Sequence, residues 1–129
     1  MEVCVDNLRS VAAAWEGGAR RVELCSSLAE GGLTPTPGMA EAARALIEEK
    51  EEAKAKAAEE GEDEDVGGGE GGMQIYALIR PRGGDFNYSP TEIKVRAVAA
   101  AALMFTGIVH IFERSRLRWA IWRFYRTIS

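Results

Sequence analysis

The only two cysteines of this 129-residue chain lie in two similar tripeptides, Glu-Val-Cys from Glu2 to Cys4 and Glu-Leu-Cys from Glu23 to Cys25. Side chains alternate between the faces of a β-strand, so the glutamate and the cysteine of each tripeptide share a face. If the tripeptides occupy matching positions on adjacent strands, about 4.8 Å apart, two thiolates could hold one soft metal ion. The same spacing permits a disulfide. The cysteines could equally be small buried hydrophobic side chains, and the residues leave these alternatives open.

A second group with possible chemistry is the loop Arg-Pro-Arg-Gly-Gly-Asp-Phe, which begins at Arg80 directly after an apolar run. The guanidinium groups of Arg80 and Arg82 could bind the oxygens of a carboxylate or phosphate. Gly83 and Gly84 would let backbone N–H groups approach the same anion, and Asp85 could orient an arginine or act as a base. The alternative is a structural loop in which Asp85 pairs with Arg82.

Burial of Glu2 and Glu23 beside the thiols requires partners, because an unpaired buried carboxylate is costly. Arg80 and Arg82 are plausible counterions, which would join acids, thiols and bases into one ligand-binding cluster. His110 is the only histidine and is interpreted as incidental. The sequence has no pattern of a catalytic triad, a P-loop or a dinucleotide-binding loop, so catalytic residues stay unknown.

The elements that must position these residues alternate between strands and helices. We expect a buried strand at 1–6, a helix from 8 to the glycines at 17 and 18, a strand at 21–25, a helix from 37, a strand at 75–79 and a helix from 90. Thr36 and Pro37 favour one helix start, and Ser89, Pro90 and Glu92 form the pattern of a capping box. This order predicts an α/β fold with parallel strands, either an open sheet or part of a closed barrel.

Charge is distributed unevenly, because the acids of this chain of net charge −4 gather in the stretch 48–70. The helix that begins near Pro37 could extend beyond Ile47 into solvent, since residues 48–60 are strong helix formers. Residues 61–72 are acidic and glycine-rich and are expected to be a disordered linker. A metal-binding or partner-binding acidic tract is the alternative. Residues 48–72 are therefore interpreted as a low-complexity insertion.

The C-terminal part departs from this pattern. Residues 107–109 could be the remnant of a fourth strand, and the segment 105–129 ends in an Arg/Trp-rich tail that resembles an altered reading frame or an alternative terminus. The nearly uncharged stretch 97–112 has sixteen residues, fewer than the ~20 of a membrane-spanning helix. The tail could contact a membrane surface, but this is not the favoured expectation, and no nucleic-acid binding is expected.

Four motifs in order resemble the CutC family: Met-Glu-Val-Cys-Val-Asp at 1–6, Gly-Gly-Ala-Arg-Arg-Val-Glu-Leu-Cys at 17–25, Glu-Gly-Gly-Leu-Thr-Pro at 30–35, and Ile-Arg-Pro-Arg-Gly-Gly-Asp-Phe at 79–86. The resemblance implies a (β/α)8 TIM barrel, a cytoplasmic location and a role in copper homeostasis with copper(I) as the bound ion. Cys4 and Cys25 match the motif cysteines and would be the metal ligands. The Arg80 loop would line the mouth of the barrel.

The chain departs from the family in length, because a (β/α)8 barrel needs about 250 residues. We expect residues 1–104 to form the N-terminal part of such a barrel, about its first three βα units. The open sheet would favour self-association or completion by another chain. Alternatives to copper binding are a TIM-barrel enzyme or binder of a small anionic metabolite, and a non-functional truncated product. With no export signal and two cysteines, reduced thiols in the cytosol are expected.

Overall fold

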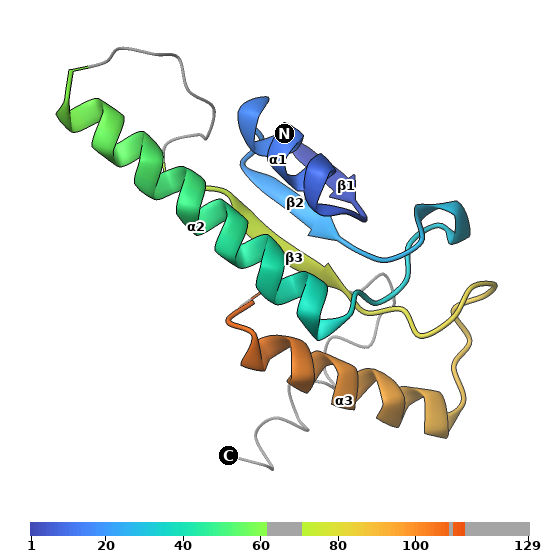
Figure 1. Ribbon diagram of the computed structural model, residues 1–129. Coiled ribbons are helices and arrows are strands. Elements are labelled where there is room, and N and C mark those ends of the chain that lie inside the picture. The colour runs from blue at the N-terminus through green and yellow to red at the C-terminus, as the bar shows by residue number, and fades with distance from the viewer. Residues whose placement is uncertain (62–70, 109, 113–129) are drawn as a thin grey trace.

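The computed structural model describes residues 1–61, 71–108 and 110–112, and its elements alternate between strands and helices (Figure 1). They follow the chain in this order: β1 (Glu2–Val5), α1 (Leu8–Glu16), β2 (Arg21–Leu24), the short 3₁₀ helix η1 (Leu28–Glu30), α2 (Pro37–Glu59), β3 (Gln74–Leu78), α3 (Pro90–Phe105) and β4 (His110–Phe112). The α/β fold predicted from the sequence is confirmed.

The four strands form one parallel sheet in the order β1-β2-β3-β4. Each strand is therefore added beside the previous one, with a helix in each connection, as in successive units of a (β/α)8 barrel. The sheet has one strand more than the three expected. The fourth strand lies at His110–Phe112 rather than at 107–109, because Gly107 has a φ of 85° and belongs to the turn after α3.

All three α-helices share one hydrophobic core with one face of the sheet. Alternate strand residues such as Val5, Val22 and Ala77 point into this core. The helices contribute Val11, Ala14 and Trp15 from α1, Ala40, Ala43 and Ile47 from α2, and Ala100 and Leu103 from α3. Because side chains alternate along a strand, the other residues of β1, β2 and β3 point to the opposite face, away from this core.

Both predicted helix starts are confirmed by their hydrogen bonds. The hydroxyl of Thr36 accepts from the backbone N–H of Met39 at 3.1 Å, at the start of α2. At the start of α3, the Ser89 hydroxyl accepts from the Glu92 N–H at 3.3 Å, and the Glu92 carboxylate accepts from the Ser89 N–H at 2.7 Å. This reciprocal capping box satisfies backbone donors that lack partners within the helix.

The helix extension considered for residues 48–60 is present, because α2 continues without a break to Glu59. The extension is held by α1 rather than projecting into solvent alone. The indole N–H of Trp15 donates to the Glu51 carboxylate at 2.7 Å, and Lys50 pairs with Glu16 at 2.9 Å. The disorder expected at 61–72 falls mostly on residues 62–70, which lie outside the described residues.

Candidate functional site

The face of the sheet opposite the helices carries a set of polar side chains that we call the polar face. Strand register places Glu2, Arg21 and Gln74 in one row across β1, β2 and β3. The next row runs across all four strands and consists of Cys4, Glu23, Tyr76 and His110. The polar face is defined by these seven residues. It brings together one of the two cysteines and both glutamates that the sequence singled out.

The two cysteines do not occupy matching positions, which corrects the expectation from the tripeptides. Cys4 lies opposite Glu23, and its Sγ is 3.6 Å from the Glu23 carboxylate. Cys25 follows the end of β2 and continues the ladder, since its N–H donates to the carbonyl of Val5 at 2.9 Å. The strand register therefore differs from the alignment of the tripeptides by two residues. A shift of two residues keeps the side of the sheet but moves Cys25 to the next row.

This offset decides which chemistry the two thiols can share. One strand spacing combined with two residues along the strand separates diagonal Cα atoms by about 8 Å. A disulfide needs Cα atoms closer than about 7 Å, and both cysteines are free thiols in the structure. Two metal–sulfur bonds, at the zinc–sulfur length of about 2.3 Å, allow the sulfur atoms to be roughly 4.6 Å apart. The diagonal placement thus disfavours a disulfide more strongly than a shared ion.

The environments of the two thiols differ. Cys4 is exposed, whereas Cys25 is 1% exposed and its Sγ lies 3.4 Å from the carbonyl oxygen of Val5. Burial raises the pKa of Cys25 to about 11, and the neighbouring Cys4, Asp6 and Glu23 add to this shift. Within the described residues, no group of three or more His, Cys, Asp or Glu side chains is arranged to hold a metal ion.

A glycine covers Cys25 from the loop after β2. A Cβ atom at Gly32 would lie 2.9 Å from Leu78 Cδ2 and 3.4 Å from Cys25 Sγ, and Gly32 has a φ of 88°. Only glycine combines this backbone conformation with so close an approach. The Glu-Gly-Gly motif thereby closes the space over the thiol.

The loop that begins at Arg80 adopts the structural arrangement that the sequence left as an alternative. Arg80 is 8% exposed, and its guanidinium donates to the carbonyl oxygens of Glu30 at 2.6 Å, Gly32 at 3.1 Å and Gly84 at 3.1 Å. These bonds tie the loop after β3 to the loop after β2. The Arg80 guanidinium therefore supports backbone rather than presenting an empty fork to solvent.

Arg82 is likewise engaged within the protein. It donates to the carboxylates of Glu92 and Asp85, the latter at 3.3 Å, and to the carbonyl oxygen of Asn87 at 3.1 Å. Its hydrogen bond is the main reason that the pKa of Glu92 is lowered to about 2, with the Ser89 N–H contributing. Binding of a small anion by Arg80, Arg82, Gly83, Gly84 and Asp85 stays a prediction.

The counterions of the two glutamates also differ from the expectation. Glu2 pairs with Arg21 at 3.0 Å, and Glu23, 5% exposed, accepts from the Cys4 thiol. The arginines after β3 bond elsewhere: Arg80 donates to carbonyl oxygens of the loops after β2 and β3, and Arg82 donates to Glu92 of α3 and to its own loop. The single cluster of acids, thiols and loop arginines was therefore wrong, because Arg21 on the neighbouring strand is nearer to Glu2 than either loop arginine.

Four members of the polar face were not predicted as site residues from the sequence: Arg21, Gln74, Tyr76 and His110. The Arg21 guanidinium lies 4.5 Å from the centre of the Tyr76 ring, which stacks on His110 at 4.5 Å between ring centres. His110 was interpreted as incidental, yet it lies in the same row as Cys4. The alternation of side chains in β3 was the available signal for Tyr76, whereas His110 required knowledge of β4.

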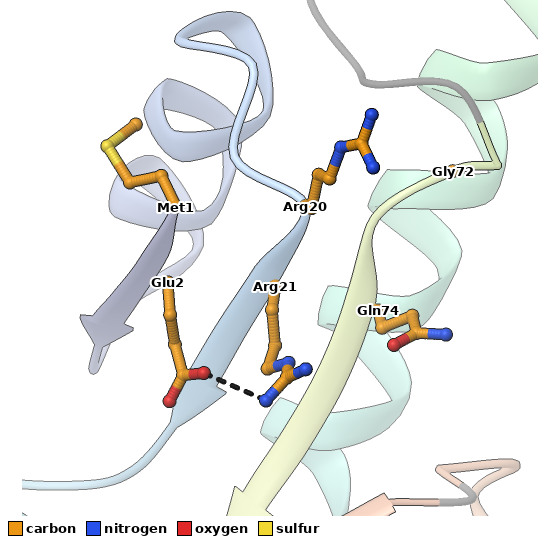
Figure 2. A pocket seen from close by; sticks show the side chains of 6 residues that line it. All are labelled: Met1, Glu2, Arg20, Arg21, Gly72 and Gln74. Carbon is orange, nitrogen blue, oxygen red and sulfur yellow. Dashed lines mark hydrogen bonds and ion pairs between the residues drawn. The ribbon is translucent and has the colours of Figure 1, made fainter.

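A cavity of about 400 Å³ lies at the amino ends of the strands, as Figure 2 shows. Its lining comes from the beginnings of β1, β2 and β3: Met1, Glu2, Arg20, Arg21, Gly72 and Gln74. The cavity lies at the amino ends of the strands, whereas Cys25 and the Arg80 loop follow the carboxyl ends. These two regions are therefore separate.

Comparison with known proteins relates the N-terminal part of the chain to a protein family. Residues 1–55 match the CutC family. Over these residues the chain is a member of the CutC family. The human "Copper homeostasis protein cutC homolog" is 38% identical over 95 residues, which cover 74% of this chain and 26% of the human protein. The family protein CutC of Photobacterium profundum is 38% identical over 112 residues, covering 84% of this chain and 36% of that protein.

A solved structure agrees with the CutC assignment. The crystal structure of the putative copper homeostasis protein CutC from Streptococcus agalactiae superposes with a TM-score of 0.63 and 26% sequence identity. The match covers 85% of this chain and 42% of that one. The chain thus spans about a quarter to a third of the length of these two relatives. The resemblance found from the four motifs is confirmed.

Among the helices of the described residues, none combines the length and the apolar character that crossing a bilayer requires. The Arg/Trp-rich tail lies outside the described residues, whereas the domain boundary proposed between 104 and 105 falls within the last turn of α3. Both stay predictions.

Proposed function

We propose that this chain serves copper homeostasis by binding copper(I) through the thiolates of Cys4 and Cys25. The names of the human relative and of the Streptococcus agalactiae structure refer to copper homeostasis, and thiolates are the soft ligands that copper(I) prefers. The proposal includes a reducing, cytoplasmic setting, because both ligands must remain unoxidised. It concerns this chain alone and assigns no enzymatic activity.

The observation that carries the proposal is the placement of both cysteines at the carboxyl end of adjacent parallel strands, one row apart on the same side of the sheet. Glu23 lies beside this position, since its buried carboxylate accepts from Cys4 Sγ at 3.6 Å. Metal binding displaces thiol protons, so the raised pKa of Cys25 predicts tighter copper(I) binding as pH increases.

The test is an anaerobic copper(I) titration against a competing chelator. The wild type should bind one copper(I) per chain, and Cys4→Ser and Cys25→Ser should each weaken binding by at least about tenfold, which is the effect of losing roughly 1.4 kcal/mol. Ser26→Ala, which lies beside Cys25 without removing a thiol, is the control. Circular dichroism of each variant verifies that the fold is retained. Unchanged affinity in the double cysteine variant would reject these ligands.

A further inference from the structure

The cavity at the amino ends of β1, β2 and β3 contains neither of the proposed copper ligands. It holds about 400 Å³ and is lined by the two consecutive arginines Arg20 and Arg21, by Glu2 and by Gln74, among others. In Figure 2, Arg21 reaches toward Glu2, whereas Arg20 is directed away from that ion pair. The cavity lining therefore has one guanidinium group in an ion pair, that of Arg21, and one outside that pair, that of Arg20.

Arg21 is already placed by its neighbours. Its Nη1 donates to the Glu2 carboxylate at 3.0 Å, and its guanidinium packs over the Tyr76 ring at 4.5 Å from the ring centre. These contacts fix the position of one positive charge at the rim. The side chains of both partners of the ion pair are nearly half exposed, at 46% for Arg21 and 43% for Glu2, so the pair remains open to solvent.

Arg20 carries a positive charge that no carboxylate of the cavity lining pairs with. Its guanidinium makes no hydrogen bond or ion pair with another side chain of the described residues. One carboxylate against two guanidinium groups leaves the described lining with a net positive charge. Gln74 adds an amide N–H₂ group, which is a neutral donor. The cavity thus offers donors and positive charge in excess of acceptors.

We propose that this cavity binds a small oxyanion, of the phosphate or phosphomonoester class. A guanidinium presents its N–H donors in a planar fork that matches two phosphate oxygens, and Arg20 is the residue that can supply this fork. Arg21 contributes a second positive charge that Glu2 and Tyr76 hold in place. The site is independent of the cysteines and lies at the other end of the sheet, so copper and the anion do not share ligands.

The test uses the 129-residue chain and inorganic phosphate, followed by isothermal titration calorimetry at constant ionic strength. Arg20→Gln should weaken phosphate binding by about tenfold or more, as expected for a charge-assisted hydrogen-bond pair. Arg20→Lys keeps the charge without the fork and should bind with intermediate affinity. Arg9→Gln removes the same charge from the exposed surface of α1, outside the cavity, and should bind phosphate as the wild type does.

The outcomes separate a specific site from general electrostatic attraction. Equal loss of binding in Arg9→Gln and Arg20→Gln would overturn the proposal, as would wild-type affinity in Arg20→Gln. Succinate serves as a carboxylate probe, and binding of succinate more tightly than phosphate would overturn the phosphate class. Retained phosphate binding in the double variant Cys4→Ser and Cys25→Ser is expected, because the two sites have no residue in common.

Discussion

At the scale of single residues, the two cysteines of the chain have different chemistry although their flanking sequences are similar. Cys4 is exposed beside a carboxylate, and Cys25 is covered by the loop after β2 with Gly32 against its sulfur. Copper(I) binding would therefore draw one ligand from the surface and one from the interior. The buried thiol sets the pH dependence of the pair.

We predict that iodoacetamide at pH 8 modifies Cys4 rapidly and Cys25 slowly. The thiolate is the reactive form, and burial raises the pKa of Cys25 from 9.0 to about 11 while also blocking access. Peptide mass spectrometry over time measures both rates in one sample, and denaturing in guanidinium chloride should equalise them. Equal rates in the native chain would contradict the buried position.

The raised pKa of Cys25 also makes the free energy of unfolding depend on pH. The folded state holds the Cys25 proton more tightly than the unfolded state, whose pKa is near 9.0. The contribution to the free energy of unfolding is therefore complete below about pH 9 and is lost as pH rises toward 11. Denaturant unfolding at pH 8 and pH 11 should show this loss, which Cys25→Ser should reduce.

At the scale of elements, α2 extends past its apolar stripe, as the strong helix formers of residues 48–60 suggested, but it does not project freely into solvent. Its apolar residues end at Ile47, yet the helix continues to Glu59. The continuation is supported by polar contacts with α1, through Trp15 and Glu16, rather than by burial of an apolar stripe. A helix segment fixed in this way should open locally when one such contact is removed.

We predict that Glu51→Ala increases hydrogen exchange in residues 52–59 while residues 40–47 remain protected. The change removes the acceptor for the Trp15 indole N–H and should lower the local opening free energy by about 1 kcal/mol or more. Glu52→Ala is the matched control, because Glu52 is exposed on the same helix. Equal exchange in the two variants would show that the Trp15 contact does not hold the extension.

At the scale of the whole molecule, the sheet is covered by helices on one face, and its polar face is opposite the helical core. In the described residues β1 and β4 are the edge strands, each with one neighbour. A closed (β/α)8 barrel pairs every strand on both sides. Unpaired parallel edges favour association with another chain.

We predict that the isolated 129-residue chain self-associates or unfolds over a broad temperature range. Light scattering coupled to size-exclusion chromatography, together with thermal unfolding followed by circular dichroism, measures both properties. The CutC protein of Streptococcus agalactiae, of which this chain covers 42%, is a suitable comparison. A monomer with one sharp cooperative transition would contradict the prediction.

Local sequence was sufficient for the features that depend on neighbouring residues. The capping box at Ser89, the helix start at Thr36 and the alternation of strands and helices were all predictable, because caps and hydrophobic periodicity act over a few residues. The four motifs also identified the CutC family. The family, the fold class and most element positions thus followed from the sequence.

Tertiary structure decided the features that depend on how distant segments are aligned. The β1 and β2 register placed Cys4 opposite Glu23, although the tripeptides suggested Cys25 as its partner. Packing placed the extension of α2 against α1, where Glu51 accepts from Trp15, and Arg21 rather than a loop arginine became the partner of Glu2. Register is set by the packing of a whole strand against its neighbours and by the connection between them, so similar short motifs alone do not determine it.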